Sequence, residues 1–151
     1  RVLGPTALTV GTIQATFSAD KYRKILDNLG PDEISRYRRH YYWDMVHPLT
    51  FAIALRDGAR ALDHHRPLAP RTRRLLAAAP VIAAAGDYAE NITGLYLLDH
   101  RNRIDDTTVR AATTISLTKW VLALGCLGYL TQGFLRVWGR AGLRRVRGNR
   151  R

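Results

Sequence analysis

Hydrophobic residues along the chain gather into four segments, which are separated by stretches rich in charge. The segments cover residues 2–19, 40–56, 75–98 and 111–135. An α-helix needs about 20 predominantly apolar residues to cross the hydrocarbon core of a bilayer. The pattern therefore predicts an all-α protein, a four-transmembrane-helix bundle that forms a single membrane domain over residues 1–151.

The four segments differ in how well they suit a bilayer. The last contains one charge, Lys119, and is apolar on every face, which is typical of a helix surrounded by lipid. The third is interrupted only by Asp87 and Glu90. The second has 11 uncharged residues, 45–55, so it crosses only if the arginines at its ends extend to the membrane surface. The first is free of charge but rich in Thr and Gly, which makes it a weak spanning helix.

The segments that connect these helices are also informative. Residues 20–39 are highly charged and contain Gly30-Pro31-Asp32-Glu33, a helix-start signal, so we expect an amphipathic helical first loop. The cluster Tyr41-Tyr42-Trp43 opens the second segment and suits the headgroup level. Residues 136–151 form a basic C-terminal tail, which we expect to contact anionic lipid headgroups and to be disordered at its end.

The net charge of +12 points to an anionic partner, either nucleic acid or a membrane surface. No helix-turn-helix, zinc or RNA-binding signature is present, so we expect no nucleic acid, although a soluble, basic, helical nucleic-acid-binding protein is an alternative interpretation. With both termini inside, the cytoplasmic side holds 14 cations and the other side nine. The positive-inside rule then predicts a multi-pass integral membrane protein with both termini in the cytoplasm.

Ionisable residues inside the apolar segments form two helical pairs and one isolated cation. Asp44 and His47 are three residues apart and share a helix face, as do Asp87 and Glu90. Because successive spans alternate in direction, both pairs and Lys119 fall in the same half of the bilayer. We expect a shared site with Asp87, Glu90, His47 and Asp44 as catalytic candidates, and Asn91, Lys119, Trp120 and Trp43 as ligand-binding candidates.

Three interpretations of this site remain open. Buried charges are usually paired, so the residues can form a purely structural network around Lys119. A carboxylic acid in an apolar environment can also hold a proton and serve in acid-base catalysis on a lipid. A metal site is disfavoured, because His47 is the only histidine well inside a segment and Lys119 would repel a cation. We therefore predict no metal and no cofactor.

The layout of the chain resembles the EXPERA family, which includes sterol isomerases and sterol-binding proteins of the emopamil-binding type. The similarity rests on Asp44 and His47 early in the second segment, Glu90 in the third and Trp120 in the fourth. Lys119 has no counterpart there. The resemblance implies a sterol, isoprenoid or other lipid ligand, and isomerisation is one activity within that family.

The sequence thus predicts a small integral membrane protein that binds a lipid at its buried polar site, with isomerisation as the enzymatic possibility. The alternative is a non-catalytic accessory subunit of a larger membrane complex, whose buried charges pair internally or with partner helices. The weak first two segments favour that alternative, since marginal helices are more easily held in a bundle with neighbours.

Overall fold

The computed structural model describes residues 7–148, and this part of the chain contains helices but no strand. Its six α-helices are α1 (Ala7–Gln14), α2 (Ala19–Asp27), α3 (Pro31–Asp44), α4 (His47–His65), α5 (Pro70–Asp99) and α6 (Asp106–Gly148). A short 3₁₀ turn, η2 (Arg101–Arg103), lies between α5 and α6. The predicted all-α class and the helical bundle are confirmed.

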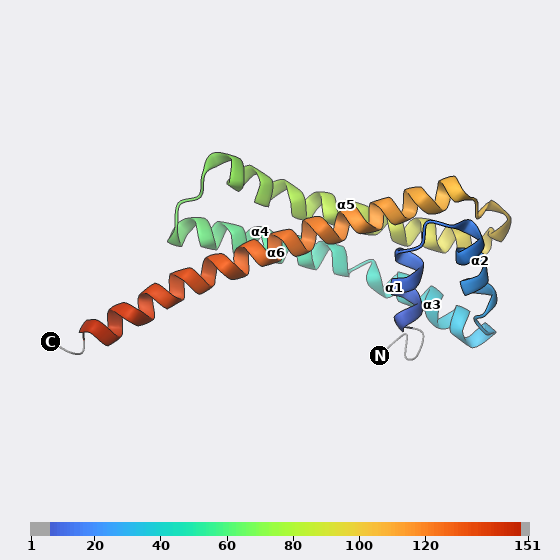
Figure 1. The fold of residues 1–151 in the computed structure, drawn as a ribbon, viewed down its shortest axis with the longest axis horizontal. Coiled ribbons are helices and arrows are strands. Elements are labelled where there is room, and N and C mark those ends of the chain that lie inside the picture. The colour runs from blue at the N-terminus through green and yellow to red at the C-terminus, as the bar shows by residue number, and fades with distance from the viewer. Residues whose placement is uncertain (1–6, 149–151) are drawn as a thin grey trace.

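The three longest helices lie along the long axis of the molecule, and the three short ones gather at one end (Figure 1). α5 and α6 form an antiparallel hairpin, and α4 packs against both. α1, α2 and α3 surround the end where α5 finishes and α6 begins. At the opposite end α6 continues beyond its neighbours as a projecting helix.

Glycines set how closely the long helices approach one another. A Cβ added at Gly133 of α6 would collide with the side chain of Leu62 of α4. A Cβ at Gly58 of α4 would lie 3.2 Å from Cδ1 of Leu130, a tight contact on the same α4–α6 interface. These glycines allow the backbones of α4 and α6 to approach closely, as small residues do at the helix interfaces of membrane proteins.

A separate core holds the short helices against the end of the hairpin. Tyr22, Leu26 and Tyr37 are buried there against Leu97 of α5 and Val109 of α6. Ion pairs at the rim support this arrangement: Arg38 of α3 contacts Asp99 of α5, and Arg101 lies 2.8 Å from Asp27 of α2. The charged residues 20–39 therefore fold as a helical cap, as the amphipathic first loop predicted.

The first predicted span, residues 2–19, differs from the structure. α1 has eight residues, which at a rise of about 1.5 Å per residue is too short to cross a bilayer. The helix ends at Gln14, and Ser18 begins α2 by accepting a hydrogen bond from the Lys21 amide at 3.4 Å. Residues 2–6 lie outside the described part of the chain.

The second predicted span, residues 40–56, is not one helix either. α3 ends at Asp44 and α4 begins at His47, so the chain is interrupted at Met45 and Val46. Pro48 accounts for the interruption, because it has no amide hydrogen to donate to the carbonyl of Asp44. Two helices therefore occupy the segment that was predicted to be a single span.

The third and fourth predicted spans lie inside α5 and α6, each as one continuous helix. Among the described helices, α6 alone is long and apolar enough to cross a membrane, over the 34-residue stretch Asp106–Gly139. The basic tail is helical as far as Gly148, and the disorder expected at its end concerns the residues that follow. Residues 149–151 lie outside the described part of the chain.

Candidate functional site

Lys119 is the centre of a buried charged cluster between α5 and α6. Its side chain is 8% exposed, and Nζ forms an ion pair with Asp87 and a second one, at 2.9 Å, with Oε2 of Glu90. Asp87 and Glu90 are one helical turn apart on α5, so both carboxylates reach the same ammonium group. An unpaired charge at this depth would carry a large desolvation cost, which the two ion pairs offset.

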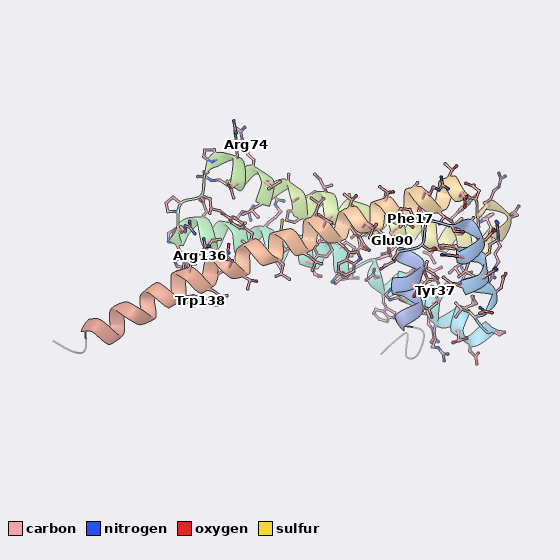
Figure 2. All side chains as sticks on the ribbon, viewed as in Figure 1. Phe17, Tyr37, Arg74, Glu90, Arg136 and Trp138 are labelled. Atoms are coloured by element: carbon pink, nitrogen blue, oxygen red, sulfur yellow. The ribbon has the colours of Figure 1, made fainter. Side chains whose placement is uncertain are left out.

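Glu90 also connects the hairpin to α1. Its Oε1 accepts a hydrogen bond from Nε2 of Gln14, at the last position of that helix. Within the described part of the chain, the ion pair with Lys119 is the only polar contact of Glu90 Oε2. Figure 2 shows Glu90 where α1 meets the long helices. Its two oxygens are therefore committed to structural contacts.

His47 connects the cluster to the break between α3 and α4. Its Nδ1 lies 3.8 Å from Oδ2 of Asp87 and 3.9 Å from Oδ1 of Asp44. Both distances exceed a hydrogen bond and leave the imidazole free to contact a third group. Asp44 is fixed separately, because Oδ2 accepts a hydrogen bond from Nδ2 of Asn91 at 3.2 Å. The side chain of His47 is 60% exposed.

These residues form one end of a groove of about 610 Å³ between α4 and α6. The polar end is lined by Gln14, His40, Asp44, His47, Asp87 and Lys119. The remaining wall is almost entirely apolar and comprises Phe51, Ala54, Leu55, Trp120, Ala123, Leu124 and Leu127. We call this feature the α4/α6 groove. Its shape and chemistry suit a ligand with a long apolar body and a small polar group at one end.

The predicted site residues fall into three groups. Asp44, His47, Asp87, Lys119 and Trp120 line the α4/α6 groove. Glu90 and Asn91 are buried behind its polar end and hold Lys119 and Asp44 in place. Trp43 lies outside the groove and is 70% exposed.

The position of Trp43 follows from helix geometry. Successive residues are rotated by about 100° around a helix, so Trp43 points away from the face that carries Tyr41 two positions earlier. Tyr41 faces the buried core, where its hydroxyl donates a hydrogen bond to that of Tyr37 at 2.6 Å. Trp43 is therefore a surface residue of α3, and we assign it no contact with a ligand in this groove.

Several groove residues were missed by the sequence analysis. Gln14 is the only amide side chain in the first apolar segment, and that was a usable signal for a polar contact. Phe51 and Leu124 gave no signal, since apolar residues in a groove and in a core have the same pattern. The choice between those two environments depends on how α4 and α6 are spaced.

Burial also perturbs the tyrosines of the cap, outside the long helices. Desolvation, with a smaller contribution from the charge of Glu90, raises the pKa of Tyr22 to about 12. Burial likewise raises the pKa of Tyr37 well above its usual value. Both phenols are thus neutral at physiological pH and act as packing and hydrogen-bonding groups.

The cluster has the chemistry of an organic binding site. Within the described residues, no group of three or more His, Cys, Asp or Glu side chains is placed to hold a metal ion. The polar end supplies the carboxylates of Asp44 and Asp87 as acceptors and the imidazole of His47 as a donor or acceptor.

Comparison with known proteins gives no match: no family model, no curated protein and no solved structure is significantly similar to the chain.

Proposed function

We propose that this protein is an integral membrane protein that binds a lipid in the α4/α6 groove. The observation that carries the proposal is the groove itself, which is apolar along its length and ends on Asp44, His47 and Asp87. A polar group of the ligand would contact these side chains, and its hydrocarbon body would lie between Phe51 and Leu124. A sterol or an isoprenoid alcohol has this distribution of polarity, and the resemblance of the sequence to the EXPERA family implies the same class of ligand.

The exterior of the long helices supports membrane insertion. Large apolar side chains are about half exposed or more on all three, and they include Leu49, Ile53, Val81, Ile82, Ile92, Val121, Leu124, Leu127 and Leu135. Soluble monomers rarely expose contiguous apolar patches of more than a few hundred Å². α6 adds a stretch long and apolar enough to span the hydrocarbon core.

The distribution of arginine favours one orientation. The connection between α4 and α5, the first turns of α5 and the far end of α6 lie at the same end of the molecule (Figure 1). These segments contain Arg66, Arg71, Arg73, Arg74 and Arg136. We propose that this end faces the cytoplasm. The four-span topology with both termini inside would also require residues 2–19 and 40–56 to cross the bilayer, and α1, with eight residues, is too short to do so alone. The basic end of α6 would contact anionic headgroups.

Isomerisation of the bound lipid is a further step within this proposal. Protonated His47 would donate its proton to one carbon of an alkene, and a carboxylate of Asp44 or Asp87 would accept a proton from the allylic carbon. The double bond moves and the composition of the lipid is unchanged. The carboxylic acid would then return its proton to His47, which lies 3.8 Å from Asp87 and 3.9 Å from Asp44, and so restore the site. Because Glu90 is engaged with Lys119 and Gln14, this scheme assigns it a supporting role in place of direct proton transfer.

A second candidate is an accessory subunit of a larger membrane complex. The far part of α6 favours it, because Leu135 and Trp138 are exposed near the end of the bundle, beyond which the helix continues without neighbours (Figure 1; Trp138 is labelled in Figure 2). Partner helices would cover these side chains. Isolation of the protein with a stoichiometric partner would support this candidate.

Native mass spectrometry of the gently extracted protein tests lipid binding in the groove. The informative variant is Leu124→Trp, which narrows the groove with a larger apolar side chain. Leu135→Trp is the matched control, since it makes the same change on α6 at an exposed site outside the groove. We expect wild type and Leu135→Trp to retain a sterol or isoprenoid alcohol and Leu124→Trp to lose it. Equal retention by all three proteins would overturn the proposal.

A further inference from the structure

A second hollow runs between α4 and α5, away from the α4/α6 groove. It consists of two depressions of about 390 and 220 Å³ that share Arg56 and Arg60. The two depressions adjoin each other at these arginines, and together we call them the α4/α5 furrow. The α4/α5 furrow has an apolar half and a charged half.

The apolar half lies between the first turns of α4 and the middle of α5. It is lined by the small side chains of Ala52, Ala84 and Ala85 and by the larger ones of Leu49, Ile53 and Val81. The three larger side chains are 47–56% exposed, so the furrow opens to the outside of the bundle. An acyl chain is the hydrocarbon that would lie against such a surface when the helices are in a bilayer.

The charged half lies between the last turns of α4 and the start of α5. Arg60 pairs with Asp57 at 2.7 Å, and Arg73 of α5 pairs with Asp63 of α4 at 3.1 Å. Arg56 forms no ion pair or hydrogen bond with any residue that the structure describes. Three arginines therefore face two carboxylates, and Arg56 supplies the unpaired positive charge.

We propose that the α4/α5 furrow binds one phospholipid with an anionic headgroup. Its phosphate would accept hydrogen bonds from the guanidinium of Arg56, whose planar donors match a phosphate, and an acyl chain would follow Leu49 and Ile53. Charge complementarity determines the choice of lipid, since a zwitterionic headgroup brings its own cation next to Arg60. The site is separate from the α4/α6 groove and uses none of the residues assigned to it.

Native mass spectrometry in mild detergent tests this site with two defined lipids of equal chain length. The full-length protein is titrated with dioleoyl-phosphatidylglycerol or dioleoyl-phosphatidylcholine. We expect wild type to prefer phosphatidylglycerol and Arg56→Gln to weaken its binding roughly tenfold. Arg74→Gln is the matched charge control, because Arg74 lies outside the furrow and points away from the body (Figure 2). We expect it to bind like wild type.

Two further measurements show whether the site binds a whole phospholipid or only a phosphate group. Ala85→Phe fills the apolar half and should reduce binding of both lipids at this site, whereas Ile82→Phe, on exposed α5 surface outside the furrow, should not. Inorganic phosphate at millimolar concentration should fail to displace phosphatidylglycerol. The proposal is overturned if wild type binds both lipids equally, if Arg74→Gln weakens binding as much as Arg56→Gln, or if phosphate alone displaces the lipid. Retention of a sterol in the α4/α6 groove should be the same in wild type and Arg56→Gln. The experiment therefore distinguishes failure of the phospholipid site in the α4/α5 furrow from failure of the sterol site in the α4/α6 groove.

Discussion

At the scale of single residues, the polar end of the α4/α6 groove is built around Lys119. Helix spacing and the alternating direction of the spans predicted that Asp44, His47, Asp87 and Lys119 lie together, and the structure brings these side chains within 4 Å of one another in pairs. The sequence could not separate the roles of Asp87 and Glu90. Residues three apart differ by about 60° around a helix, which is enough to turn one toward the groove and the other toward α1.

Replacing Lys119 tests whether this cluster holds the hairpin together. Lys119→Met keeps an unbranched side chain of similar bulk but leaves Asp87 and Glu90 buried without a cation, so we expect a loss of roughly 3 to 5 kcal/mol in stability. Glu90→Gln keeps the Asp87 ion pair and an acceptor for Gln14, and should cost clearly less. Thermal unfolding in detergent, followed by circular dichroism, measures both. Equal destabilisation by the two variants would contradict this role for Lys119.

The buried tyrosines of the cap predict an alkaline transition. Burial raises the pKa of Tyr22 to about 12 in the folded protein, against a usual value near 10. The stabilisation linked to this shift is complete below pH 10 and is lost as the pH rises through 10 to 12, because the unfolded chain releases the proton first.

Substitution of the same tyrosine makes this dependence measurable. Tyr22→Phe should move the midpoint of alkaline unfolding to higher pH, since the buried group can no longer ionise. Tyr42→Phe is the control at an exposed position of α3 and should leave the midpoint unchanged. An alkaline midpoint that is the same in Tyr22→Phe and wild type would show that other groups control the transition.

At the scale of helices, hydrophobic pattern predicted where apolar segments lie better than where helices end. The segments 75–98 and 111–135 lie within α5 and α6, whereas 2–19 and 40–56 each contain a helix end. Local hydrogen bonding determines these ends. Ser18 caps α2, and Pro48 interrupts the chain between α3 and α4. Such contacts act over a single helical turn. The mean hydropathy of a long segment therefore does not reveal them.

Close approach between helices predicts which glycines are sensitive. A Cβ at Gly94 of α5 would collide with the ring of Tyr41 of α3, which is buried and hydrogen-bonded. We expect Gly94→Ala to destabilise the protein by about 1 to 3 kcal/mol through overpacking. Gly125→Ala meets no atom within 4 Å and should be neutral or stabilising by up to about 1 kcal/mol through helix propensity. Chemical denaturation of both variants checks the contrast, and a stable Gly94→Ala protein would contradict this packing.

At the scale of the whole molecule, the chain divides into a charged cap and three long helices with an apolar exterior. The charged first loop indicated α2 and α3 of the cap, and the last two apolar segments indicated α5 and α6, whereas α1 and α4 were expected as parts of other spans. The α4/α6 groove could not be, because its volume depends on how the interruption at Met45 and Val46 redirects α4 relative to α6. The α4/α5 furrow could not be predicted either, because it is lined by alanines, and the sequence does not show which helix an alanine packs against.

Photolabelling in membranes tests the central claim most directly. Membranes that contain the protein are exposed to a photoreactive sterol, irradiated, and digested for peptide mapping by mass spectrometry. We predict labelled residues on both walls of the α4/α6 groove, within 51–55 of α4 and 120–127 of α6, and removal of the label by excess unlabelled sterol. Labelling spread over the outer surfaces of α5 and α6, with no competition by unlabelled sterol, would contradict a lipid-binding groove.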